Sequence, residues 1–234
     1  MKMIKYILCA VSLLSVPNLT ALAEEIPRVP RGKAGDPADK IKFEHLKLRE
    51  GVRLFYGASM IRSNYPYVWV QLPGAEKHLE FTHENAQQVF TPIKSEQAAM
   101  EFVRFFHTGI TIDSEKVYTA AMKAAEKLGF KATIDKTPTH YGFKAMKGEN
   151  GSIEVRLLIY GENHGQYQLQ EYRYFFGKNG FEKKEKMIYL KGPYTSWQTG
   201  PLDTEQTQNA EAKRWSELAR FSKEVGGAIN KAEQ

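Results

Sequence analysis

The chain has 234 residues, 42% of them hydrophobic, and its 33 lysines and arginines against 27 aspartates and glutamates give a net charge of +6. The basic excess is spread along the chain and forms no stripe, so we expect no nucleic acid partner. The single cysteine, Cys9, lies in an N-terminal apolar run, so the rest of the chain has no disulfide and no cysteine-based metal site. The fold must therefore be stabilised by packing.

The first 23 residues have the layout of a cleavable secretory signal. Lys2 and Lys5 precede an apolar run from Tyr6 to Val16, and Ala21-Leu22-Ala23 gives a small-x-small cleavage pattern. The apolar run is shorter than the roughly 20 residues that a membrane-spanning helix needs. The pattern predicts a signal peptide over residues 1–23, export to the periplasm or the medium, and no transmembrane anchor.

Residues 24–40 are rich in proline, glycine and charge, which is typical of a flexible tether. Residues 41–230 are predicted to form a single globular domain, with a sub-boundary allowed near residues 92–95. Its first strands are expected over Val52–Ile61 and Tyr65–Leu72, where β-branched and aromatic residues are frequent, with a short strand at Leu79–Phe81.

Helices are expected next. Thr82 is placed to cap a short helix, and Ser95 and either Asp113 or Ser114 are placed to cap two longer ones, ended by Gly109 and Gly129. Each longer helix has a single apolar stripe, so we expect both to lie across one face of a sheet. A last helix is expected from Asn209 to Asn230.

After Pro138 the hydrophobic pattern alternates in four runs that begin near Tyr141, Ile153, Gln166 and Phe181. Asn150-Gly151 and Asn179-Gly180 are hairpin signals, and Asn163-His164-Gly165 is interpreted as a three-residue turn. The predicted fold is α+β: a long curved four-stranded antiparallel meander packed by the two amphipathic helices, with extra N-terminal strands and a C-terminal helix.

This order of helices followed by a long meander resembles the outline of cystatin-like and NTF2-like folds. Inhibitors, enzymes and scaffolds are all built on such folds, so the resemblance implies a fold outline and no function.

The sequence holds no recognised catalytic, metal or cofactor motif. His83-Glu84 lacks the second histidine of a zinc-protease motif, and Ser59 lacks the second glycine of a nucleophile elbow. Glutamates and arginines of the meander are expected to form cross-strand pairs on a solvated face. These residues are Glu154, Arg156, Glu171 and Arg173. No metal and no cofactor are therefore expected.

Aromatic residues crowd the end of the meander and occupy both faces of its third strand. Such a sheet needs a second cover, either another layer of the chain or a partner. Tyr172 and Tyr174 point the same way, and Tyr160 lies just across the Asn163-His164-Gly165 turn. We expect Tyr160, Tyr172, Tyr174 and Trp197, with Arg156 nearby, to form one continuous binding surface.

The favoured function is a non-catalytic binding module of the cell envelope that contacts a protein, a peptide or a small amphiphile. An extracytoplasmic enzyme, most plausibly a hydrolase with an unrecognised site, is the alternative, and a purely structural envelope role is a third. An enzyme should show convergent Glu, His or Arg with perturbed pKa values, whereas a binding module should show an exposed aromatic patch.

Overall fold

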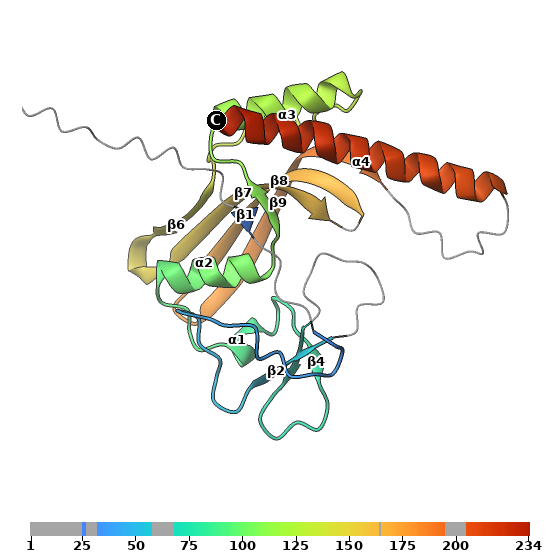
Figure 1. Ribbon diagram of the computed structural model, residues 1–234. Coiled ribbons are helices and arrows are strands. Elements are labelled where there is room, and N and C mark those ends of the chain that lie inside the picture. The colour runs from blue at the N-terminus through green and yellow to red at the C-terminus, as the bar shows by residue number, and fades with distance from the viewer. Residues whose placement is uncertain (1–24, 27–31, 58–67, 164, 195–204) are drawn as a thin grey trace, which may run out of the picture.

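The computed structural model describes residues 25–26, 32–57, 68–163, 165–194 and 205–234 (Figure 1). The predicted signal peptide and Trp197 lie outside these residues. The described chain is an α+β fold with two antiparallel sheets, as the sequence predicts.

The smaller sheet is built from three short strands in the order β2-β3-β4. They are β2 (Arg53–Tyr56), β3 (Val68–Gln71) and β4 (Leu79–Glu80), which fall within the three predicted strands. The helix after them, α1 (Ala86–Val89), begins after Asn85 and not after Thr82. The Asn85 side-chain oxygen instead accepts the backbone N–H of Thr82 at 3.0 Å, which fixes the turn between β4 and α1.

The described part of residues 24–40 is attached to the domain. The backbone N–H groups of Gly35 and Ala38 donate to the carbonyls of Tyr56 and Leu54 at 2.7 and 2.9 Å, and Ala38 is buried. Upstream, β1 (Glu25–Ile26) pairs with β5 (Gly109–Thr111). The described residues of this segment are joined to the domain by backbone hydrogen bonds, which do not need apolar side chains.

The two longer helices begin where the sequence predicts. Helix α2 (Glu96–Phe105) starts after Ser95, whose hydroxyl oxygen accepts the backbone N–H of Ala98 at 3.1 Å. Helix α3 (Glu115–Lys127) starts after Ser114, whose hydroxyl oxygen accepts from Val117 at 3.4 Å. Each hydroxyl satisfies a backbone donor that the first turn of a helix leaves without a partner.

The larger sheet contains the predicted meander. Its strands are β6 (Phe143–Lys147), β7 (Ile153–Asn163), β8 (Gln166–Gly177) and β9 (Gly180–Tyr194). Asn150 and Gly151 have φ angles of 58° and 75°, as the predicted tight turn between β6 and β7 requires. The strand order is β1-β5-β7-β8-β9, and β6 pairs with the first half of β7.

Alternate residues of β7 and β8 point to opposite faces of this sheet. We call them the α2 face, which carries Val155, Leu157, Tyr172 and Tyr174, and the α3 face, which carries Leu158, Tyr160 and Leu169. Helix α2 packs on the first face, whereas α3 and α4 (Glu205–Glu233) pack on the second. Figure 1 shows α3 and α4 side by side at one end of the sheet and α2 nearer the small sheet.

The prediction that both longer helices lie across one face of the meander is therefore wrong. The short strand β5 lies between α2 and α3 in the chain and pairs with β7 at Ile110↔Tyr160 and Thr111↔Ile159. Because the connection enters the sheet as a strand, the chain leaves α2 on one face and begins α3 on the other.

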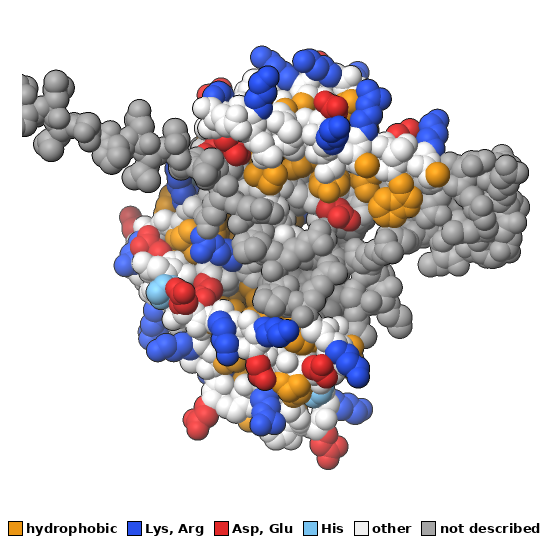
Figure 2. All heavy atoms as spheres, in the orientation of Figure 1, with side chains coloured by type: hydrophobic (Ala, Val, Ile, Leu, Met, Phe, Trp, Pro, Cys, Tyr) orange, Lys and Arg blue, Asp and Glu red, His pale blue; other side chains and the backbone are white. Residues whose placement is uncertain are grey.

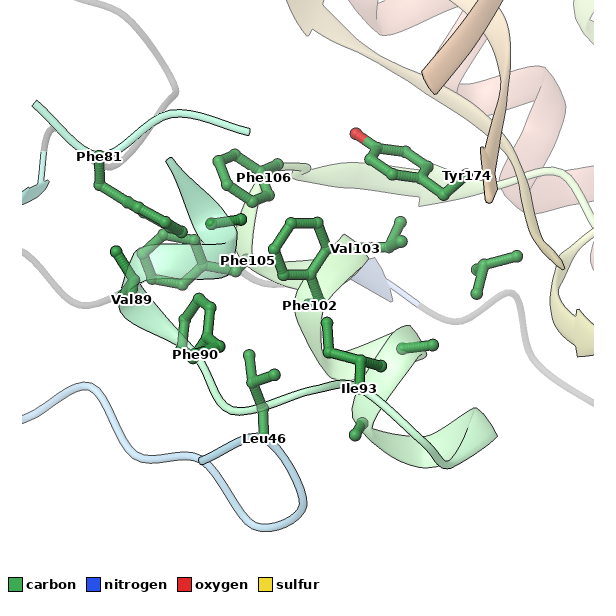
Figure 3. Packing of buried hydrophobic residues seen from close by; sticks show 14 of the residues in the cluster. Leu46, Phe81, Val89, Phe90, Ile93, Phe102, Val103, Phe105, Phe106 and Tyr174 are labelled. Carbon is green, nitrogen blue, oxygen red and sulfur yellow. The ribbon is translucent and has the colours of Figure 1, made fainter. Parts of the chain in front are cut away.

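The core on the α2 face is dominated by phenylalanine rings (Figure 3). Phe102 lies at its centre with no exposed surface, and its ring is 5.0 Å from that of Phe106 and 5.5 Å from that of Phe176. Helix α2 also holds the N-terminal segment, since the Glu101 carboxylate accepts the backbone N–H groups of Glu44, His45 and Leu46 at 2.6–2.8 Å.

The core on the α3 face is completed by the C-terminal half of α4. Leu218, Phe221, Val225 and Ile229 are its buried residues. Gly192 of β9 allows this approach, because a Cβ atom there would lie only 2.4 Å from the Phe221 ring. Lysine and arginine side chains gather on the outer surface of α3 and α4 (Figure 2).

Among the described helices, none combines the length and apolar character needed to cross a membrane.

Candidate functional site

The residues of the predicted aromatic surface lie on two opposite faces of the sheet. Tyr172 and Tyr174 are buried on the α2 face, 2% and 0% exposed, whereas Tyr160 is buried on the α3 face at 3% exposed. Arg156 also lies on the α3 face, and Trp197 lies outside the described residues. The prediction that Tyr160 and Arg156 share one exposed surface with Tyr172 and Tyr174 is therefore wrong.

The error comes from the length of the turn between β7 and β8. A three-residue turn over residues 163–165 would pair even-numbered residues with even-numbered ones and put Tyr160 on the face of Tyr172. In the structure Asn163 pairs with Gln166, so the loop has two residues, and Tyr160 pairs with Leu169. A shift of one residue moves every side chain of a strand to the opposite face.

Arg156 belongs to a chain of ion pairs on the α3 face. Its Nε donates to Glu154 Oε1 at 2.6 Å, and the same oxygen accepts from Arg173 Nε at 2.9 Å. Glu185 then lies 3.5 Å from Arg173 and 2.6 Å from Lys183. Partial burial opposes ionisation of Glu154, yet hydrogen bonds from the two arginines hold its pKa below the ordinary value. The expectation of cross-strand Glu/Arg pairs is confirmed for Glu154 with Arg173, whereas Glu154 and Arg156 are neighbours on the same strand, β7.

Three residues that are far apart in the sequence meet on the α2 face. The Tyr174 hydroxyl lies 2.7 Å from His107 Nε2 and 3.1 Å from His83 Nε2. His83 comes from the turn before α1, and its ring stacks on Phe106 at 3.8 Å. His107 follows α2, and its ring lies 4.1 Å from that of Tyr172. Figure 3 shows Tyr174 at the edge of the phenylalanine core, with its hydroxyl pointing to the side on which Phe106 lies.

Both imidazoles are held neutral. Burial, together with the nearby Lys184 ammonium, lowers the pKa of His83 to about 4 and places the pKa of His107 well below its ordinary value. Because Tyr174 has one hydroxyl hydrogen, it donates to one imidazole and accepts an N–H from the other. The arrangement is a hydrogen-bonded relay without net charge.

Amide side chains continue the polar contacts along the same face of β8. Tyr172 donates its hydroxyl hydrogen to Gln170 Oε1 at 2.9 Å, and Gln168 Nε2 donates to Gln166 Oε1 at 2.9 Å. Gln168 and Gln170 are buried. The glutamines at alternate positions of β8 could have indicated buried polar contacts from the sequence alone. The His83–Tyr174–His107 cluster could not, because its members are far apart in the sequence and no local pattern connects them.

Two exposed lysines of β9 lie beside this buried floor of tyrosine, histidine and glutamine side chains. Lys184 and Lys186 pair in register with Tyr174 and Tyr172, and their Nζ atoms lie 6.0 and 5.6 Å from the centre of the Tyr172 ring. Partial desolvation lowers the pKa of both lysines, and for Lys186 the Lys184 charge contributes. We call this group the α2-face polar site; it comprises His83, His107, Gln168, Gln170, Tyr172, Tyr174, Lys184 and Lys186.

A separate open hollow of about 380 Å³ lies beside α3. Its walls come from one flank of that helix and from the chain that follows it, namely Tyr118, Thr119, Met122, Lys123, Glu126, Gly129, Phe130, Lys131 and Ala132. No histidine or arginine lines it, so it offers fewer chemical groups than the α2-face polar site.

Within the described ranges, no three His, Cys, Asp or Glu side chains are grouped to share a metal ion. No protein family, curated protein or solved structure matches the chain.

Proposed function

We propose that the protein is an exported, non-catalytic binding module of the cell envelope, and that it holds its ligand at the α2-face polar site. The proposal of export rests on the signal-like pattern of residues 1–23. The observation that carries the binding role is the combination of a buried floor of tyrosine, imidazole and amide groups with two exposed lysines beside it.

This floor differs from the rest of the α2 face in its chemistry. Val155, Leu157 and Phe176 fill the neighbouring positions with apolar side chains, and they pack against the phenylalanines of α2. Buried polar groups are costly unless every one finds a partner, so a core with no other role is stabilised at least as well by apolar residues. Hydrogen-bonding groups converging beside exposed lysines are typical of a surface that selects a ligand.

The experiment is an NMR titration of the 15N-labelled protein with two neutral probes, dodecyl maltoside below its micelle concentration and an uncharged tetrapeptide. We expect at least one probe to shift the backbone amides of residues 166–172 and 184–188, with smaller effects on α3. Gln168→Leu should weaken that binding, whereas Lys183→Gln, on the opposite face of the same sheet, should leave it unchanged. Shifts confined to the hollow beside α3 would contradict the proposal.

One observation favours an enzyme as the second candidate. The His83–Tyr174–His107 relay places a hydroxyl between two neutral imidazoles, an arrangement suited to moving a proton. A hydrolase should turn over chromogenic carboxylic or phosphate esters, and His83→Gln should reduce kcat while the protein stays folded. Turnover that survives this change would remove the relay from any catalytic role.

A further inference from the structure

We propose that the ligand of the α2-face polar site carries a phosphate- or carboxylate-type anionic group, which binds between the exposed ammonium groups of Lys184 and Lys186. This inference rests on the proposed function and adds the charge of the ligand to it. Free anionic small molecules and anionic lipid headgroups share this chemistry.

The argument begins with the partners of the charged residues on the two faces of the same strands. On the α3 face, Arg156, Arg173 and Lys183 each contact a carboxylate within 3.5 Å. On the α2 face, Lys184 and Lys186 form no ion pair with any residue that the structure describes, and Lys186 Nζ donates to the Gln168 amide oxygen at 3.4 Å. Glu84 influences Lys184 electrostatically without contacting it.

The two ammonium groups are placed to act together. Residues i and i+2 of a strand lie about 7 Å apart on the same face, and four-carbon stems allow both Nζ atoms to reach one oxyanion. Both groups already lie over the same tyrosine ring, at 5.6 and 6.0 Å from its centre. Partial desolvation strengthens any charge interaction made there, because water screens it less.

A third cation, Lys191, lies close to these two lysines. Lys191 pairs in register with Gln168, and its charge contributes to lowering the pKa of Lys186. The row of neighbouring positive charges repels itself in the unliganded protein, and a bound anion would relieve that repulsion.

A structural explanation competes with this inference. Strand β9 is an edge of the sheet, and lysines on edge strands protect against pairing with other chains. That explanation predicts that removing the lysines promotes aggregation, and it predicts no effect on the binding of any anion.

The experiment measures binding of the full chain to phenyl phosphate by calorimetry, and to phosphatidylglycerol vesicles by sedimentation. Phosphatidylcholine vesicles and phenol are the uncharged controls. We expect phenyl phosphate, the vesicles, or both to bind, and Lys184→Gln with Lys186→Gln to weaken binding at least tenfold. The matched variant, Lys178→Gln with Lys183→Gln, removes the same charge from the β8–β9 turn and the α3 face, and should change affinity less than twofold.

The calorimetry with phenyl phosphate and the sedimentation with vesicles together identify the source of the anion. Lysine-dependent binding of phenyl phosphate supports a free small molecule, and lysine-dependent binding to anionic vesicles alone supports a lipid headgroup. As a spectroscopic check, binding should raise the pKa of Lys184 and Lys186, followed through their side-chain 13Cε signals.

Three results would overturn the inference: no binding of either anionic probe, equal losses in the two double variants, or aggregation of the first with unchanged anion binding. If a neutral probe shifts the amides of the α2 face while no anion binds, the anionic ligand is ruled out and the binding module stands. If neither neutral nor anionic probes act on this face, the proposed function fails as well.

Discussion

The two faces of the larger sheet hold most of their polar side chains in different ways, although the α3 face also buries one pair, the Glu171 carboxylate with the Tyr189 hydroxyl at 2.6 Å. On the α3 face, Glu154 and Glu185 join two arginines and a lysine into a chain of charged pairs that is partly open to solvent. On the α2 face, the polar groups are neutral and buried, and the charged residues beside them are without carboxylate contacts among the described residues. The charged groups of the α3 face therefore have carboxylate partners within the protein. Lys184 and Lys186 have none among the described residues, and this difference supports the proposed ligand site.

The largest expected difference between the faces concerns their buried tyrosine hydroxyls. Tyr174→Phe leaves His83 and His107 without their shared partner and should lower the free energy of unfolding by about 3 kcal/mol. Tyr160→Phe should change it by less than about 0.5 kcal/mol, because the Tyr160 hydroxyl approaches Ser222 but makes no well-placed hydrogen bond. Urea unfolding at pH 7 measures both. Equal losses of unfolding free energy in the two variants would show that the His83–Tyr174–His107 relay does not distinguish the two faces.

Acid should act first through the α2 face. The pKa of His83 is about 4 in the folded protein against 6.5 in the unfolded chain, so the unfolded state binds more protons between these values. Stability is therefore complete above pH 6.5 and is lost as the pH falls toward 4. We expect a loss on the order of 2 kcal/mol between pH 7 and pH 4.5, to which His107 contributes in the same direction.

Urea unfolding at several pH values measures this loss of stability. His83→Gln should make the free energy of unfolding depend less on pH, whereas His45→Gln, at an exposed position, should leave that dependence unchanged. The ion pairs of the α3 face respond at lower pH, because the pKa of Glu154 is held below its ordinary value. A stability that stays constant down to pH 4.5 would refute the neutral, buried state of the imidazoles.

A smaller effect should separate the charges of the two faces. Glu154→Gln weakens the bonds to Arg156 and Arg173 and should lower stability by about 1 kcal/mol, less at high salt. Lys186→Gln should keep stability within about 0.5 kcal/mol of the unmodified protein or raise it slightly, because it removes repulsion and no ion pair. Thermal unfolding at low and high salt compares the two variants.

The smallest expected change concerns the helix that covers the α3 face. Gly226 and Gly227 lie inside α4, and a Cβ atom at Gly227 would meet open space. Gly227→Ala should therefore stabilise the protein by about 0.5 kcal/mol through helix propensity. If Gly227→Ala instead lowered the free energy of unfolding in urea, position 227 would require glycine for a reason other than helix propensity.

Local signals predicted most of the elements and few of the contacts between them. Ser95 and Ser114 were identifiable as helix caps, and Asn150-Gly151 as a tight turn, because each depends only on its neighbours in sequence. The strand β5 was missed, since three residues carry no periodicity, and with it the passage of the chain from one face to the other. The turn at residues 163–166 was misjudged by one residue, which inverted the faces of the aromatic side chains.

Strand β7 contributes alternate side chains to two otherwise separate hydrophobic cores. Val155, Leu157 and Ile159 belong to the core of α2, and Leu158 and Tyr160 to the core of α3 and α4. Neither core can lose its packing while this strand stays fully ordered in the other, so the two layers should open as one cooperative unit. Amide hydrogens at the centre of β7 should then exchange with solvent only through global unfolding, even though they lie between two cores of different composition.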